Sequence, residues 1–296
     1  LPEIKFDIWC GFIFINFDEN AKPLNEYLGV LPDHFKNWKL EDRYIETHVI
    51  KKLPANWKVS AEAFLEAYHV LETHSEGVYT AGDANADYDI FGDHVSRFIH
   101  TIGYTSPHIT ENRPSEQEIL DMLLGKRTEE GSGQILPEGS TAREVYAENV
   151  QETMKEKFKQ DFSHLTVTET IDSIEYFAFP NAFFFPGLQL SMVYRFRPNG
   201  VDGALFDLLF LRPKPVDGPC PPPPEPFALE IEDSYTKCPG TEFLGAVYDQ
   251  DTNNLLSQTK GFKSSFKKGQ SLGNYQEART RHFHQTIDKY LETNNG

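Results

Sequence analysis

The hydrophobic positions of this chain repeat with two periods, one typical of strands and one typical of helices. Runs rich in β-branched and aromatic residues predict strands at residues 8–17, 44–50, 94–102, 166–171, 176–185, 189–197 and 204–211. Helical spacing and capping residues predict helices at 23–28, from Asn56 to Tyr68, after Ser115, after Thr141 and from Asn274 to Thr293. The first strand, 8–17, is continuously apolar, so we expect it to be buried.

The order of these elements predicts an α+β domain. Most strands follow one another in the second half of the chain, and Pro180, Pro186 and Pro198 begin turns between them. Helices are segregated toward the ends, which favours an antiparallel sheet with flanking helices. The proline-dense stretch 213–226 is predicted to be an extended connection. The acidic stretch with Asp83, Asp87, Asp89 and Asp93 is predicted to be a loop.

Composition and charge narrow the classes of function. The chain has 296 residues, of which 39% are hydrophobic, so it can bury a large core. A net charge of −17 argues against nucleic acid or an anionic membrane as partner. We find no apolar run near the roughly 20 residues that span a bilayer. The three cysteines, Cys10, Cys220 and Cys238, cannot form a disulfide framework, so we expect a reducing, cytoplasmic location.

One histidine pair carries the candidate chemistry. His69 and His74 follow a helix-competent run, and Glu66 stands three residues before the first of them. Residues five apart differ by about 140° around a helix, so both rings can reach one metal only if the helix ends or distorts between them. Glu66 shares a helical face with His69 and is placed to accept a hydrogen bond from its ring. With ten histidines in the chain, such a pair arises by chance roughly one time in three, so alone it favours a structural role.

The residues around the pair add a specific pattern. Asn56-Trp57-Lys58, followed by Glu66, Tyr68, His69 and His74, resembles the iron motif of the large (alpha) subunit of Rieske non-haem iron ring-hydroxylating oxygenases. The segments 11–17, 179–181, 249–251, 261–264 and 281–284 are also similar to that family. The resemblance covers the family's catalytic domain from end to end, so we expect residues 1–296 to form that single domain.

The third ligand must be a carboxylate from elsewhere in the chain. Asp249 and Asp251 are both candidates, and Asp233 and Asp207 are more remote ones. Counting back from Gly261 registers Asp251 with the family's ligand. The acidic triplet also suits an ordinary helix start, where carboxylates complement the helix dipole.

The resemblance implies a fold and a mechanism. It implies a helix-grip (START/SRPBCC-like) sheet in which His69, His74 and Asp251 hold a mononuclear Fe(II) that uses O2 as co-substrate. Glu66, where the family usually has aspartate, would be the electron-transfer bridge to a Rieske [2Fe-2S] cluster in the neighbouring subunit of an α3 or α3β3 trimer. Electrons would come from NAD(P)H through a reductase or ferredoxin, and the substrate would be an apolar or aromatic small molecule. Dihydroxylation and monooxygenation both remain open.

The ligands of a Rieske cluster are missing from this sequence. The cluster needs a Cys-x-His and a Cys-x-x-His pair, and none of the three cysteines begins either one. A chain that starts almost directly with an apolar strand also reads as the continuation of something upstream. We therefore expect a Rieske domain upstream of these residues.

The sequence also predicts roles for residues outside the proposed ligand set. Ala63, Val70, Leu71, Val247 and Leu255 flank the ligands in sequence and are predicted to form the walls of a substrate pocket. The aromatic run 183–185 could line an apolar substrate pocket, but core packing is the favoured prediction. A structural role is predicted for His94, His100 and His108, and a surface or subunit-contact role for His282 and His284.

Two other functions fit the same features. A helix-grip domain without a cluster can be a carrier of a hydrophobic ligand, and two histidines with one carboxylate also suit a zinc hydrolase. Metal analysis separates the three readings, because the oxygenase predicts iron, the carrier no metal and the hydrolase zinc.

Overall fold

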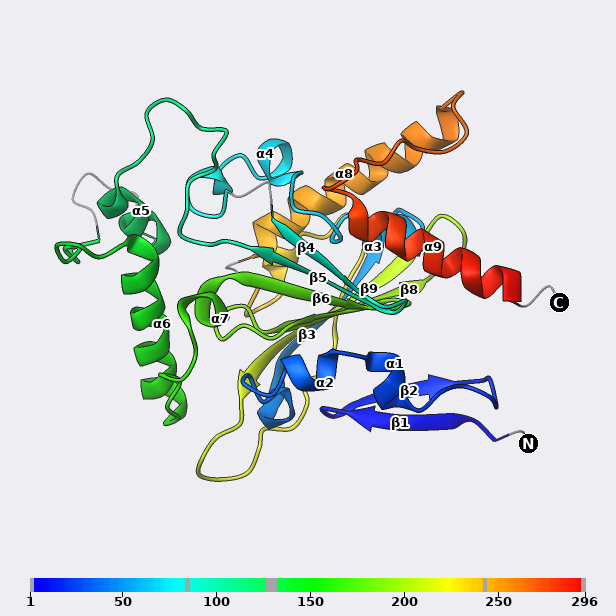
Figure 1. Cartoon of the computed structure of the whole chain (residues 1–296), viewed down its shortest axis with the longest axis horizontal. Helices are drawn as coiled ribbons and strands as arrows, with labels where there is room; N and C mark the ends of the chain where they lie inside the picture. Colours follow the sequence, from blue (N-terminus) through cyan, green and yellow to red (C-terminus); the bar gives the residue numbers. More distant parts are fainter. Residues whose placement is uncertain (1–2, 83–85, 126–131, 242–243, 294–296) are drawn as a thin grey trace.

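A mixed eight-stranded sheet forms the centre of the computed structural model, which describes residues 3–82, 86–125, 132–241 and 244–293 (Figure 1). Its strand order is β10-β3-β9-β8-β7-β6-β5-β4, and every neighbouring pair is antiparallel except β10 and β3. The strands are β3 (Arg43–Leu53), β4 (Asp87–Phe91), β5 (Val95–His100), β6 (Ser173–Ala178), β7 (Ala182–Phe185), β8 (Met192–Pro198), β9 (Ala204–Pro213) and β10 (Phe227–Leu229). A separate hairpin consists of β1 (Lys5–Trp9) and β2 (Phe12–Asn16).

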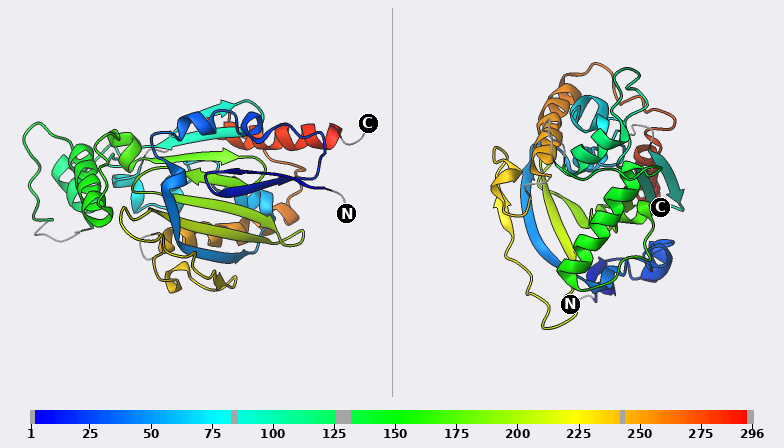
Figure 2. Two further views of the ribbon diagram at one scale, coloured as in Figure 1. Left: turned by 90° about the horizontal axis from the view of Figure 1, so that it is seen from below. Right: turned by 90° about the vertical axis from the view of Figure 1, so that its left-hand side faces the viewer.

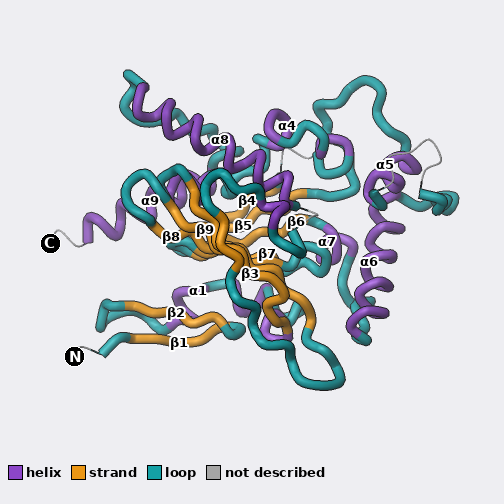
Figure 3. Tube along the Cα trace, turned by 180° about the vertical axis from the view of Figure 1, so that it is seen from behind, coloured by secondary structure: helices purple, strands orange, loops and turns teal. Residues whose placement is uncertain are grey.

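Helices cover both faces of the sheet and one end of it. The α-helices are α1 (Leu24–Leu28), α2 (Leu31–His34), α3 (Trp57–Glu62), α4 (Val70–Thr73), α5 (Glu116–Leu123), α6 (Ala142–Phe158), α7 (Val167–Ile171), α8 (Gly245–Ser264) and α9 (Ala278–Thr293), with short 3-10 helices at Leu40–Asp42, Gly77–Tyr79 and Tyr235–Lys237. Helices α3, α8 and α9 lie on one side, and α1, α2 and the hairpin lie on the other (Figures 1 and 3). Helices α5 and α6 project beyond one end of the sheet (Figure 2).

The alternation of side chains along the strands creates two cores. Phe177 of β6 and Phe183 of β7 pack with Phe283 of α9 on the helix-rich face. Their neighbours Tyr176 and Phe184 point to the opposite face, into a second core under α1, α2 and the hairpin. This is the period of two expected for a sheet that is covered on both faces. The expected α+β, helix-grip architecture is confirmed. None of the helices within the described residues is long and apolar enough to cross a membrane.

The predicted first strand, 8–17, is wrong in two respects. Cys10 and Gly11 both have positive φ, +50° and +85°, and they turn the chain into the hairpin β1–β2. One face of the hairpin is exposed, with Phe6 and Ile13 about 70% accessible, whereas Trp9 on the other face is buried. The segment 8–17 is apolar on both faces of the predicted strand, and this pattern did not indicate the turn at Cys10 and Gly11.

Four further boundaries differ from the prediction. Residues 166–171 form a cap and helix α7 because Thr166 and Glu169 make a reciprocal capping box. The segment 176–185 is two strands, β6 and β7, that meet at 179–181. Part of the predicted acidic loop is strand β4, whereas Asp83 lies outside the described residues. The last helix begins at Ala278, because the Glu277 carboxylate accepts from the Gly273 amide and a turn precedes the helix.

Candidate metal centre

The two histidines lie at the ends of one short helix. The side chain of Asn56 accepts from the Lys58 amide (3.0 Å) and caps α3, which ends at Glu62. The non-helical segment 63–69 follows, and α4 is a single turn with His69 at its start and His74 at its end. The predicted helix from Asn56 to Tyr68 is therefore too long. His69 and His74 thus flank this single turn, and the chain leaves the helical conformation only at His74, where φ is −118° and ψ is 50°.

Three side chains converge at this point. Asp251, from the first half of α8, places Oδ1 2.9 Å from His74 Nε2 and 3.5 Å from His69 Nε2. The three potential ligand atoms all lie within 4.8 Å of one another. Ligands on one face of an octahedral ion lie roughly 3 Å apart, so this arrangement suits a two-histidine, one-carboxylate site with open positions.

The outer nitrogen of each imidazole is already engaged. His69 Nδ1 lies 2.6 Å from Glu66 Oε1, and His74 Nδ1 lies 2.7 Å from Gln250 Oε1. Because both acceptors are oxygens without a proton to donate, each Nδ1 carries the hydrogen. Each Nε2 faces Asp251 and is the ring nitrogen that a metal ion would bind in place of a proton. Outer hydrogen bonds of this kind fix the tautomer of metal-binding histidines.

The charges of the cluster favour a cation. Burial opposes the protonated form of His69, yet hydrogen bonds to Asp251 and Glu66 outweigh it and raise the pKa of His69 to about 10. Burial alone would raise the pKa of Asp251, but the hydrogen bonds from the two imidazoles lower it. Asp251 is only 7% exposed and stays ionised. A buried carboxylate that faces two imidazoles calls for positive charge, which a divalent ion would supply.

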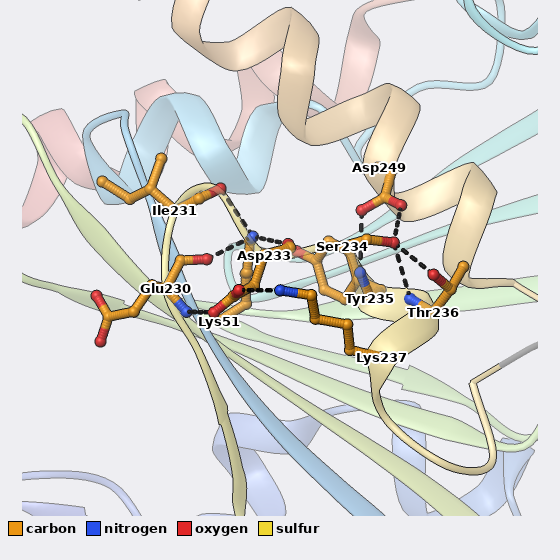
Figure 4. A network of polar contacts seen from close by, with 9 residues as sticks. All are labelled: Lys51, Glu230, Ile231, Asp233, Ser234, Tyr235, Thr236, Lys237 and Asp249. Atoms are coloured by element: carbon orange, nitrogen blue, oxygen red, sulfur yellow. Dashed lines mark hydrogen bonds and ion pairs between the residues drawn. The ribbon is translucent and has the colours of Figure 1, made fainter.

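The competing candidate Asp249 is used elsewhere. Its carboxylate accepts from the Tyr235 amide (3.0 Å) and from the Ser234 hydroxyl (2.5 Å), as Figure 4 shows. The same loop is held by the ammonium of Lys51, which is 1% exposed and donates to the backbone carbonyls of Glu230, Ile231 and Asp233. Asp249 thus ties α8 to the loop that precedes it and does not face the histidines.

The remote acidic candidates are also engaged in ion pairs. Asp207 pairs with His48, Arg195 and Arg197 on the sheet. Asp233 pairs with Lys237. Of the four carboxylates considered for the third ligand, the structure brings Asp251 to the Nε2 atoms of the histidine pair.

A cavity of about 150 Å³ adjoins the cluster. Three of the predicted wall residues, Ala63, Val70 and Val247, line it. Leu71 and Leu255 are not among its lining residues. Leu71 is turned about 100° around α4 from Val70, and Leu255 lies a full turn beyond Asp251 on α8, inside the core. Proximity to a ligand in sequence did not predict proximity to the cavity.

Most of the wall comes from the sheet and was missed. The described lining residues that the sequence did not single out for the pocket include Phe64, Phe98, Ser173, Glu175, Leu190, Met192, Tyr194, Leu244 and Tyr248. The available signal was the period of two on β6 and β8, which puts Ser173 with Glu175 and Met192 with Tyr194 on one face. The hydroxyls of Tyr194 and Tyr248 hydrogen-bond each other at 2.7 Å, so this part of the wall presents rings rather than unpaired polar groups.

Two residues predicted to be structural also line the cavity. His100 of β5 is 7% exposed and contributes to the wall, as does Phe185, the last residue of the aromatic run, whereas Phe183 and Phe184 are core. His94 stacks on Tyr27 with ring centroids 4.1 Å apart, in agreement with a structural role. His108 is exposed.

The histidines of the last helix make contacts within the chain. His282 Nε2 lies 2.8 Å from the Gly92 carbonyl, and His284 Nε2 lies 2.7 Å from Glu62 Oε1. The predicted surface or subunit-contact role does not account for these bonds. They fasten α9 to the sheet and to α3.

Comparison with known proteins gives a family match over most of the chain. Residues 33–293 match the family described as the ring hydroxylating alpha subunit, catalytic domain. Over 73 residues, 24% of this chain and 20% of the relative, the sequence is 32% identical to the carnitine monooxygenase oxygenase subunit of Acinetobacter pittii (strain PHEA-2). The chain thus spans a fifth of that curated relative.

Solved structures share the fold at low sequence identity. A quaternary ammonium Rieske monooxygenase in complex with L-carnitine superposes with a TM-score of 0.57 at 14% identity, covering 97% of this chain and 60% of that one. Naphthalene 1,2-dioxygenase with indole in its active site gives a TM-score of 0.56 at 14% identity, covering 97% of this chain and 64% of that one. This chain therefore spans about three fifths of the length of these structures.

Proposed function

The chain belongs to the ring hydroxylating alpha subunit family, of which it covers the catalytic domain, and from this we propose that it hydroxylates a small molecule with O2 at a mononuclear non-haem Fe(II). The substrate is an apolar or aromatic molecule, and the outcome is cis-dihydroxylation or monooxygenation. The observation that carries the proposal is the convergence of His69, His74 and Asp251 beside an aromatic-lined cavity.

Each residue of the cluster has a defined task. His69 and His74 offer Nε2, and Asp251 offers a carboxylate oxygen, which together make up the three protein ligands. Gln250 and Glu66 hold the proton on the outer nitrogens and keep both rings aimed. Bound there, Fe(II) supplies the redox chemistry that the reduction of O2 requires.

The cavity binds the substrate beside the ligands. Phe64, Phe98 and Phe185 offer ring faces and edges, and Val70 and Val247 fill the space near the ligands. An apolar ligand is held there by burial, which contributes about 25 cal/mol per Å² of apolar surface removed from water. The same walls exclude water from the ligand cluster, so that a reactive centre is protected when substrate is present.

Electrons must reach the site from outside residues 1–296. We propose that they come from NAD(P)H through a reductase or ferredoxin and a Rieske [2Fe-2S] cluster. Glu66 is the bridging residue, since its carboxylate contacts His69 while its side chain keeps 12% of its surface accessible. Its role as a bridge places the cluster in a neighbouring subunit, so we propose a trimer, α3 or α3β3, in the cytoplasm.

A second substrate class has its own support. The carnitine monooxygenase subunit is a relative over a short stretch, and aromatic rings such as those of Phe98, Tyr194 and Tyr248 attract quaternary ammonium groups. Binding of L-carnitine and of indole to the purified protein, each followed by calorimetry, distinguishes the two classes. Binding of indole alone supports the apolar substrate, and binding of L-carnitine alone supports the cationic one.

Metal analysis of the purified protein tests the proposed function. We expect about one iron per chain and a ferrous–nitrosyl signal in the electron paramagnetic resonance (EPR) spectrum once nitric oxide is added. Zinc in place of iron, with no affinity for reduced iron after exchange, would support the hydrolase. No affinity for either metal, together with binding of hydrophobic ligands, would support the carrier.

A further inference from the structure

The segment that carries Glu66 and His69 is not held by a helix. Helix α3 ends at Glu62 and α4 begins at Val70, and the segment between them is held in part by hydrogen bonds to residues outside it. The Ala67 amide donates to the Tyr88 hydroxyl (3.0 Å), and the Tyr68 hydroxyl donates to Glu277 Oε1 (3.2 Å). The carbonyl of Leu65, directly before Glu66, accepts from Arg279 (3.4 Å). The position of the segment therefore depends on residues near the end of the chain.

Arg279 joins three parts of the molecule with one guanidinium. Besides the Leu65 carbonyl, it donates to Ser96 Oγ of β5 (3.1 Å) and to Glu175 Oε1 of β6 (2.7 Å). The guanidinium also lies over the Phe98 ring, 5.0 Å from its centroid. Much of what Arg279 contacts also lines the cavity. Glu175 and Phe98 are lining residues, and so are residues of the segment that follows Leu65.

The arginine and its carboxylate partner are fully inside the protein. Arg279 is 0% exposed and Glu175 is 1% exposed. Burial raises the pKa of Glu175 to about 7, although the charge of Arg279 acts in the opposite direction. Replacing a buried ion pair by apolar residues is often neutral or stabilising, so the pair is weak evidence for a role in stability alone. A planar fork with fixed donor directions is suited to holding several acceptors in one geometry.

We propose that Arg279 is a positioning residue for the metal centre. It holds the Leu65 carbonyl against β5 and β6, and this fixes where the Glu66 carboxylate and the His69 ring point. The inference rests on the proposed function, because the consequence it draws is for metal binding. Arg279 touches neither the metal ligands nor the substrate in this account and acts through the backbone of 65–69.

The test separates positioning from charge balance. Arg279→Met removes the group that favours ionisation of Glu175 and so changes the protonation of a buried carboxyl as well, and the double variant Arg279→Met/Glu175→Gln, which has no carboxyl there, is compared with it. Arg279→Lys keeps a positive charge but cannot reproduce the three-way fork. The matched control is Arg143→Met. Arg143 of α6 also donates to a buried carboxylate, that of Asp172, and to a backbone carbonyl, that of Ile102. It is not among the residues that line the cavity.

Three readouts are measured on each variant: the melting temperature, the Fe(II) dissociation constant by anaerobic chelator competition, and the EPR spectrum of the ferrous–nitrosyl complex. We expect the double variant to bind Fe(II) about tenfold more weakly and to show an altered spectrum, as for other residues that orient metal ligands indirectly. Arg279→Lys should fall between the parent and the double variant. Arg143→Met should lower the melting temperature without either change. Parent-like affinity and spectrum in the double variant would overturn the proposal.

Amide hydrogen exchange keeps this inference distinct from the proposed function. Residues 65–69 should exchange faster in the double variant than in Arg143→Met, whether or not iron is bound. If the parent protein binds no iron but this exchange rises, the proposed function fails and the positioning of the segment stands. If the parent binds iron and the exchange is unchanged, only the positioning role fails.

Discussion

At the scale of single residues, the proposed metal centre depends on which nitrogen of each imidazole carries the proton. Glu66 and Gln250 each place an oxygen within 2.7 Å of an Nδ1 and so turn both Nε2 atoms toward Asp251. A ring without such an acceptor can adopt the other tautomer or rotate. The two hydrogen bonds are therefore as much a part of the site as the ligands.

Replacing Gln250 tests this dependence. Gln250→Leu removes the acceptor of His74 but leaves all three ligands in place, so we expect Fe(II) affinity to fall about 10- to 100-fold. Gln250→Glu preserves an oxygen acceptor and should bind iron at least as well as the parent. Both affinities can be measured by chelator competition. Equal affinities for the leucine variant and the parent would show that the His74 hydrogen bond has no role in metal binding.

The sequence predicted which three side chains converge better than it predicted their surroundings. The family pattern around His69 and His74 pointed to them, and register with Gly261 separated Asp251 from Asp249. Gln250 was not singled out, because its hydrogen bond to His74 can be recognised only when the orientation of its side chain on α8 is known. Leu71 and Leu255 were misplaced for the same reason.

At the scale of elements, the site lies where α4 and α8 meet one face of the sheet. His69 and His74 flank the single turn of α4, and α8 presents Asp251 from its second turn. The strands then supply most of the cavity wall through alternate residues of β5, β6 and β8. Strand alternation was visible in the sequence. The sequence did not show which face of the sheet lies next to the proposed metal centre, because this depends on how the sheet packs against α3, α8 and α9.

Within the sheet, Asp207 on β9 gives a prediction for pH. Burial opposes ionisation of this carboxyl, but its hydrogen bonds to His48, Arg197 and Arg195 outweigh burial and lower its pKa below the usual 3.8. A carboxyl with a lowered pKa contributes stability that is complete above its unfolded pKa, near 4, and is lost as the pH falls below that value. Asp207→Asn should therefore cost about 2–3 kcal/mol at pH 7, and the cost should shrink toward pH 3.

Chemical denaturation of the parent and of Asp207→Asn at several pH values measures this difference. Asp33→Asn is a suitable control, because Asp33 forms an ion pair with Lys36 in which both side chains are more than 70% exposed, and exposed pairs contribute little. A difference for Asp207→Asn that stays constant between pH 7 and pH 3 would contradict the assignment.

At the scale of the whole molecule, the site joins distant parts of the chain. His69 and His74 lie in the first third of the sequence, Asp251 lies on α8, and Arg279 reaches Leu65 from the last helix. Local patterns predicted the α+β class and most strands of the sheet. They could not predict the order of strands or the meeting of α8 with 63–74, because those contacts depend on tertiary packing. Only the family resemblance linked the two ends beforehand.

The hairpin β1–β2 shows the limit of local patterns most clearly. Its apolar residues suggested a buried strand, but one of its faces is exposed and the other covers the core around Trp9. A strand pattern does not reveal what covers each face.

The iron content of Asp251→Ala tests the central claim most directly. The parent and Asp249→Ala should each retain about one iron per chain, whereas Asp251→Ala should lose nearly all of it, since two imidazoles alone do not complete the site. Circular dichroism of the three proteins checks that each one is folded. Iron at the parent level in a folded Asp251→Ala protein would contradict the assignment of His69, His74 and Asp251 as the metal centre.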